Sequence, residues 1–94
     1  MHSSEVATIM FTLTKFREGY AMADVDAFLE RSRAALAQWE AGRAAELQAV
    51  AVAEVRFSPT NFRKGYDQDQ VDDFLDKLSA TLTDYEHGRS PRSY

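Results

Sequence analysis

Histidines and paired carboxylates are the residues of this chain whose types could do chemistry. His2 and His87 stand near the two ends of the sequence, and neither has the spacing of a metal site or a catalytic triad. Three close pairs of acidic residues could form a carboxylate cluster: Asp24 and Asp26, Asp67 and Asp69, Asp72 and Asp73. Acidic residues at helix starts more commonly cap the helix and favour the positive end of its dipole. We therefore expect no catalytic residue, no metal and no cofactor.

Charge and cysteine content narrow the function classes further. The chain has no cysteine, which excludes disulfides, thiol catalysis and cysteine–metal sites. Its 11 Lys and Arg residues against 15 Asp and Glu give a net charge of −4, which opposes binding to nucleic acid through phosphate neutralisation. There is no glycine-rich phosphate loop. The sequence predicts a protein that is not an enzyme, with protein partners and no nucleic-acid partner.

Length and hydropathy indicate where such a protein would act. The 94 residues correspond to one small domain, and 45% hydrophobic with 28% charged residues is an ordinary globular composition. No apolar run approaches the ~20 residues of a membrane-spanning helix. The first residues lack the basic region and apolar block of a secretory signal. We expect a cytoplasmic protein whose membrane contact, if it has one, is peripheral.

An internal repeat organises the chain. A shift of 46 residues aligns segment 11–43 with segment 57–89, and 15 of these 33 positions are identical without a gap. The identities include a Gly-Tyr pair and a Phe-Arg pair in each copy, which argues against chance similarity between two helices. The predicted organisation is a single domain over residues 1–94, with a first repeat at 4–41, a second repeat at 50–87 and a flexible tail at 88–94.

Each repeat is predicted to contain a short helix, an irregular loop and a longer helix. In the second repeat, Asp67 and Gln70 have the spacing of a capping box, and Gly88 and Pro91 follow the helix. The long helices carry apolar residues at alternating steps of four and three, a heptad-like stripe. The residues of these stripes that we expect to be largely buried are Val25, Phe28, Leu29, Leu36, Trp39, Val71, Phe74, Leu75, Leu78 and Leu82.

The first repeat departs from the second at two important positions. Ala21 stands where the second repeat has the capping Asp67. Ser32 interrupts the stripe where the second repeat has Leu78. The serine either leaves room for a larger partner residue or is a plain defect in the stripe.

The stripes predict an all-α fold in which the two repeats pair as a coiled-coil-like helical bundle. Pairing within one chain is favoured, because the ~25 residues between the long helices can span the ~30 Å length of a helix. A homodimer that exchanges repeats between chains is the alternative arrangement. In that case one unbroken helix could run through Gly42, since a single glycine costs only ~1 kcal/mol.

The segment between the short and the long helix carries the sharpest motif. Phe-x-x-Thr-x-Phe-Arg-x-Gly-Tyr occurs at 11–20 and at 57–66, and Val-Asp-x-Phe-Leu follows each time. This pattern resembles the N-terminal domain of the DivIVA family, the bacterial scaffolds of septum placement and polar growth, and the actinobacterial branch is the most similar. The resemblance covers nearly the whole chain as two copies. The first copy departs from it at 21–24, where Ala-Met-Ala-Asp replaces a more acidic spacer.

The resemblance implies a fold and a function. DivIVA heads are parallel coiled-coil dimers with crossed loops, which touch the membrane through an exposed phenylalanine and a neighbouring basic residue. Carried over to this chain, the candidate membrane or partner contacts are Phe16, Arg17, Phe62, Arg63 and Lys64. The implied role is a scaffold or adaptor of cell division or polar growth near the septum or poles, which contacts partners through its helical stripes. A longer DivIVA-type scaffold or a second copy would be the partner, and the 94 residues hold no family rod for filament building.

The residues alone leave the roles at the loops open. Phe16 and Phe62 could equally belong to the core, because aromatic residues at matched positions of a repeat commonly pack inside. Arg17 and Arg63 could pair with an acidic residue of their own domain, for which Asp26 and Asp72 are the named candidates. A small helical interaction domain unrelated to division, without membrane binding, is the alternative function.

The Gly-Tyr pairs are interpreted as structural. We expect Gly19 and Gly65 at positions of positive φ or of close backbone approach. Tyr20 and Tyr66 are expected to pack under the loop with their hydroxyl groups near the surface.

Overall fold

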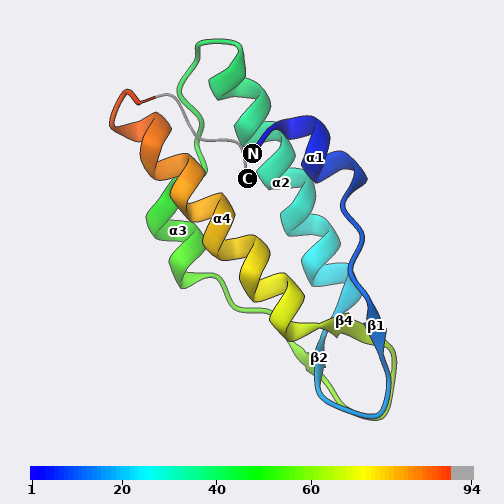
Figure 1. Cartoon of the computed structure of the whole chain (residues 1–94). Helices are drawn as coiled ribbons and strands as arrows, with labels where there is room; N and C mark the ends of the chain where they lie inside the picture. Colours follow the sequence, from blue (N-terminus) through cyan, green and yellow to red (C-terminus); the bar gives the residue numbers. More distant parts are fainter. Residues whose placement is uncertain (90–94) are drawn as a thin grey trace.

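Two long helices run side by side through a molecule 43 Å long (Figure 1). They are α2 (Met22–Glu40) and α4 (Gln68–Glu86), and both begin at the same end of the molecule and lead away from it. A short helix packs along each of them: α1 (Ser3–Thr8) along α2, and α3 (Ala49–Glu54) along α4. The structure, a computed structural model, describes residues 1–89.

A small antiparallel sheet joins the two repeats where the long helices begin. Its strands are β1 (Leu13–Thr14), β2 (Gly19–Tyr20), β3 (Pro59–Thr60) and β4 (Gly65–Asp67). The strand order is β1-β4-β2-β3, so strands of the first and second repeat alternate across the sheet. Every pairing in it joins one repeat to the other. The loops 15–18 and 61–64 therefore cross at this end of the molecule (Figure 1).

The prediction of an all-α, coiled-coil-like bundle is wrong. Residues 1–89 form four helices and a four-stranded antiparallel sheet, a mixed fold of α and β structure. Short and long helices occur in both repeats, but the predicted irregular loops contain strands. These strands are two or three residues long, too short to show the period of two by which a strand is recognised. Each strand pairs with a strand of the other repeat, and a pattern within one short segment cannot indicate such a distant partner.

Equivalent residues of the two repeats meet at both ends of the long helices. Tyr20 and Tyr66, which are 46 positions apart, face each other in the β2–β4 register. At the far end Trp39 stacks on its equivalent Tyr85, with ring centroids 5.4 Å apart and planes 6° from parallel. The repeats are thus related by a pseudo-twofold axis, and α2 and α4 are parallel. The two repeats pair within one chain, which is the arrangement favoured from the sequence.

Gly42 separates the two repeats rather than lying inside a helix. It adopts a φ of +79°, the left-handed conformation that suits glycine after a helix end. The Arg43 N–H donates back to the Gln38 carbonyl oxygen at 2.9 Å, which closes the last turn of α2. A helix running through Gly42 is therefore absent from this arrangement.

The second repeat ends in the same way. Gly88 has a φ of +71°, and the Arg89 N–H donates to the Asp84 carbonyl oxygen at 2.8 Å. The first two residues of the predicted flexible tail are therefore a helix cap. Residues 90–94 of that tail lie outside the described part of the chain.

Most of the predicted stripe is buried. The predicted positions with an exposed fraction of 5% or less are Val25, Phe28, Leu36, Val71, Phe74, Leu78 and Leu82. Leu29, Leu75 and Trp39 are less buried than these seven, and all three pack against the buried core. Leu29 and Leu75 line shallow grooves beside α1 and α3, at the flanks of the long helices.

Ser32 belongs to the interior. Its side chain is fully buried, and its hydroxyl donates to the Phe28 carbonyl oxygen at 2.8 Å. The equivalent Leu78 is also fully buried. A small residue matched with a large one at equivalent positions of a pair fits a packed core. This favours the interpretation that Ser32 leaves room for a larger residue.

Leu78→Ala is expected to lower the free energy of unfolding by ~2–5 kcal/mol, because it removes fully buried atoms and leaves a cavity. Leu75→Ala removes the same atoms from a partly exposed site, so its cost should be no more than about half as large. Chemical denaturation of both variants measures the difference. Equal losses of stability would show that the two positions do not differ in burial.

Candidate functional site: the crossed-loop tip

The two crossed loops, residues 15–18 and 61–64, form the end of the molecule beyond the sheet, which we call the tip (Figure 1). Phe16 is 85% exposed there and Phe62 is 81% exposed. Each phenylalanine forgoes the ~1.5–3 kcal/mol that burial of its side chain would contribute. The alternative that these residues belong to the core is wrong.

The second loop also holds its phenylalanine in a rare backbone conformation. Phe62 has a φ of +57°, and among residues 1–89 it alone combines a side chain with a positive φ. The left-handed region costs a residue with a Cβ atom roughly 1–2 kcal/mol. Strain of this kind at an exposed position is typical of residues kept for contact with a ligand or a surface.

Gly19 and Gly65 allow the two repeats to approach closely beneath the tip. A Cβ atom on Gly19 would lie 2.9 Å from the Tyr66 carbonyl oxygen, and one on Gly65 would lie 2.9 Å from the Tyr20 carbonyl oxygen. A Cβ atom on Gly65 would also collide with the hydroxyl of Thr60. Of the two predicted explanations for these glycines, close approach is confirmed. The positive-φ glycines of the described chain lie elsewhere.

The two tyrosines link the repeats through carboxylates. The Tyr20 hydroxyl donates to Asp72 Oδ1 and the Tyr66 hydroxyl donates to Asp26 Oδ1, both at 2.7 Å. Asp26 and Asp72, expected as partners of the arginines, thus accept hydrogen bonds from tyrosines instead. Both tyrosine rings pack against a phenylalanine: the ring centroids of Tyr20 and Phe57 are 5.4 Å apart, and those of Tyr66 and Phe11 are 5.5 Å apart. The predicted position of the tyrosines is confirmed.

These contacts favour the protonated phenols. Burial, and then the hydrogen bond to Asp72, raises the pKa of Tyr20 to about 12. The hydrogen bond to Asp26, and then burial, raises the pKa of Tyr66 to about 12. Both values lie well above the ordinary tyrosine pKa of about 10.

Stability should fall as the pH rises through this range. A phenol whose pKa is about 10 unfolded and about 12 folded stabilises the fold fully below pH 10 and loses that contribution by pH 12. The denaturation midpoint should therefore drop between pH 10 and pH 12. The Tyr20→Phe/Tyr66→Phe variant has no phenols to titrate here, so its midpoint should drop less. Parallel curves for the two proteins would show that these tyrosines do not couple to folding.

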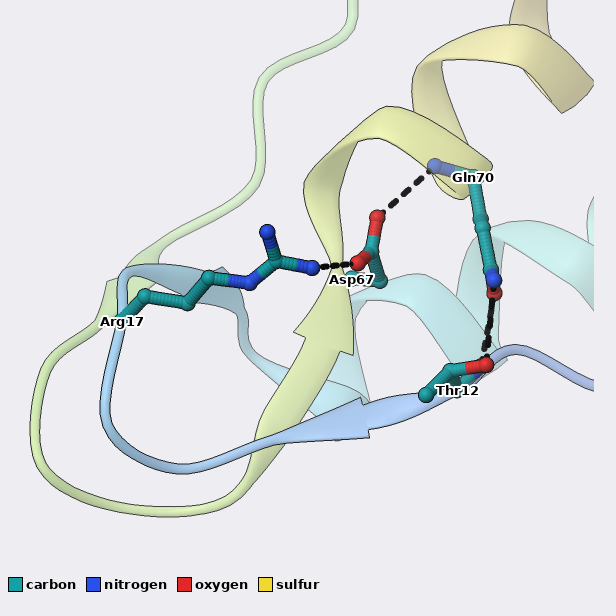
Figure 2. A network of polar contacts seen from close by, with 4 residues as sticks. All are labelled: Thr12, Arg17, Asp67 and Gln70. Carbon is teal, nitrogen blue, oxygen red and sulfur yellow. Dashed lines mark hydrogen bonds and ion pairs between the residues drawn. The ribbon is translucent and has the colours of Figure 1, made fainter.

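The Arg17 side chain points from the tip toward Asp67 of the second repeat (Figure 2). Its guanidinium forms an ion pair with Asp67, whose other carboxylate oxygen accepts from the Gln70 N–H at 3.1 Å and caps α4. The Gln70 side chain in turn binds Thr12, accepting from its N–H at 2.7 Å and donating to its hydroxyl at 3.0 Å. The predicted cap at Asp67 is confirmed, and the same carboxylate neutralises Arg17.

Arg63 has no such partner. The residue equivalent to Asp67 is Ala21, which carries no carboxylate. Arg63 and Lys64 are exposed, and neither makes a hydrogen bond or an ion pair within residues 1–89. The Lys15 ammonium lies 6.0 Å from the centre of the Phe16 ring. The tip thus combines two exposed aromatic side chains with unpaired cations.

Five of the six carboxylates in the three acidic pairs make polar contacts instead: Asp24, Asp26, Asp67, Asp72 and Asp73. Asp24 accepts from the Ser58 N–H at 3.0 Å, in the place that Gln70 occupies in the other repeat. His87 Nδ1 lies 2.8 Å from the Thr83 carbonyl oxygen. Within residues 1–89, no three His, Asp or Glu side chains are grouped closely enough to hold a metal ion.

Sequence reasoning missed the contacts that cross between repeats. Asp24, Asp26 and Asp72 were each assigned to a helix start or to an arginine, yet each binds the other repeat. The signal that could have found the Arg17–Asp67 ion pair was the difference between Asp67 and Ala21 at equivalent positions.

Of the described helices, none combines the length and the apolar character needed to cross a bilayer. No protein-family model, curated protein or solved structure matches this chain.

Proposed function

We propose that this protein is a non-catalytic scaffold or adaptor of bacterial cell division or polar growth that touches the membrane through its tip. The observation that carries the proposal is the exposure of Phe16 and Phe62 at the same end of the molecule, 85% and 81%. The cellular role is taken from the resemblance of the repeated motif to the DivIVA head. In this chain one polypeptide supplies both loops of such a head.

The distribution of charge supports a contact at this end. The tip together with Asp67, the ion-pair partner of Arg17, holds four basic residues, Lys15, Arg17, Arg63 and Lys64, against the acidic Glu18 and Asp67, which is a net +2. The whole chain has a net charge of −4, so the remainder carries −6. This separation would turn the tip toward an anionic bilayer and the rest of the molecule away from it.

The apolar stripes are not available for the partner contacts expected from the sequence. Their central residues are buried between the two repeats of the same chain. A scaffold partner, whether a longer DivIVA-type protein or a second copy, would have to bind the outer faces of the helices or the tip. The proposal therefore assigns the membrane contact to the tip and leaves the stripes as core.

The location of a fluorescent fusion in the bacterial host tests this function. We expect signal at the septum or the poles for the natural sequence and a diffuse signal for the Phe16→Asp/Phe62→Asp variant at equal expression. A pull-down with the host's long DivIVA homologue tests the scaffold part. Diffuse signal from the natural protein, together with no capture of that homologue, would contradict the proposal.

A further inference from the structure

The two loops of the tip are chemically unequal although they carry the same motif. In the first loop the guanidinium of Arg17 is held by Asp67, beside the start of α4 (Figure 2). In the second loop Arg63 meets Ala21 at the equivalent position and stays unpaired within residues 1–89. One substitution between the repeats, Ala21 for Asp67, accounts for this difference.

A second pair of equivalent positions adds to the inequality. Position 18 is a glutamate, which accepts from the Gln68 side chain at 3.1 Å, and its equivalent at position 64 is a lysine. Lys15 and Arg17 are thus balanced by Glu18 and Asp67, and the first loop with its partner has no net charge. The second loop carries Arg63 and Lys64 with no acidic residue, so the tip's net +2 lies entirely there.

We propose that Arg63 and Lys64 are the anionic-phospholipid contact of the tip, whereas the first loop supplies an apolar anchor without one. This inference rests on the proposed membrane function and names the lipid class and the residues that select it. Guanidinium and ammonium groups bind phosphate oxygens through charge-assisted hydrogen bonds. Arg63 and Lys64 directly follow Phe62, whose backbone has a φ of +57° and whose ring is exposed. Insertion of that ring would bring both cations to the headgroups.

Matched single substitutions separate this proposal from an effect of net charge. Arg63→Gln and Arg17→Gln each remove one positive charge from the same motif position. Arg63→Gln, and likewise Lys64→Gln, should weaken binding to anionic vesicles about fivefold, the contribution of one basic residue near the surface. Arg17→Gln should weaken it less than about twofold, because that guanidinium lies back beside Asp67 and charges away from the surface are screened.

Separate substitutions at positions 67 and 21 should change binding to anionic vesicles in opposite directions. Asp67→Asn keeps a side-chain oxygen for the cap of α4 but releases Arg17, so anionic binding should rise about fivefold. Ala21→Asp supplies a carboxylate where Arg63 can reach it, so anionic binding should fall about fivefold.

The measurement is vesicle co-sedimentation of the whole chain, with phosphatidylcholine vesicles and with vesicles in which roughly a third of the lipid is phosphatidylglycerol. Circular dichroism confirms that each variant is folded, and Lys64→Gln provides an independent variant. Equal losses for Arg63→Gln and Arg17→Gln, or no preference of the natural protein for phosphatidylglycerol, would overturn this inference while binding itself upholds the membrane contact. No binding to either vesicle would overturn both.

Discussion

Gly65→Ala is expected to lower the free energy of unfolding by ~3 kcal/mol, the upper part of the range for overpacking a rigid interior. The new methyl group would meet the Tyr20 carbonyl oxygen at 2.9 Å and the hydroxyl of Thr60. Neither neighbour can yield easily, since Tyr20 lies in a central strand and Thr60 is 2% exposed. Thermal or chemical denaturation measures the loss.

Two companion variants make the result specific to the close approach. Thr60→Ala removes the colliding hydroxyl, which is buried without a hydrogen-bond partner within residues 1–89, so Gly65→Ala/Thr60→Ala should recover part of the stability. Gly42→Ala has open space around the new methyl and should lose only the ~1–2 kcal/mol of its left-handed backbone, with no rescue by Thr60→Ala. A Gly65→Ala protein as stable as the natural one would contradict the interleaved sheet.

Phe16→Asp/Phe62→Asp should abolish membrane binding with little effect on folding. Two inserted phenylalanines are worth ~3–6 kcal/mol together, so their loss should weaken binding about a hundredfold to ten-thousandfold. Both side chains are exposed, so the free energy of unfolding should fall by no more than ~0.5 kcal/mol. Co-sedimentation with anionic vesicles and a denaturation curve measure the two effects.

Val50→Asp is the matched control for this variant. Val50 is another exposed apolar residue, at 59%, but it lies on α3 away from the tip. It should leave vesicle binding unchanged. If Val50→Asp and the double tip variant reduced binding equally, the contact would depend on general surface hydrophobicity and not on the tip.

The strength of the contact limits how the protein would work. Two phenylalanines and two basic residues give roughly 5–8 kcal/mol, about as much as one myristoyl chain, which anchors only marginally. A single molecule should therefore bind and leave the bilayer readily. Stable location at a membrane would need several copies or a partner assembly, which fits a scaffold or an adaptor.

The repeat and the helices could be predicted because their signals are local. The stripe positions Leu36, Leu78 and Leu82 recur at helical spacing, and the Asp67 cap precedes its helix by a fixed interval. The strands could not be predicted in this way, because each is two or three residues long and pairs with a segment of the other repeat. Contacts between distant segments are set by topology rather than by spacing.

The site was predicted in its residue types but not in its contacts. The Phe-Arg motif identified the loops, yet an amphiphilic loop leaves it open whether Phe16 packs inside or faces solvent. Within one repeat Asp26 looked like a partner for Arg17. The crossing of the loops instead brings the arginine to Asp67 of the other repeat and gives Asp26 to Tyr66.

A fluorescent reporter at the tip tests the membrane contact most directly. The chain has no cysteine, so a single Asn61→Cys can carry an environment-sensitive dye beside Phe62 without replacing either phenylalanine. Ala44→Cys, exposed in the loop that follows α2 at the far end, is the control. On addition of anionic vesicles, we predict a blue shift and a rise in emission at position 61 and no change at position 44. No shift at position 61, or an equal shift at both positions, would contradict a membrane contact made by the tip.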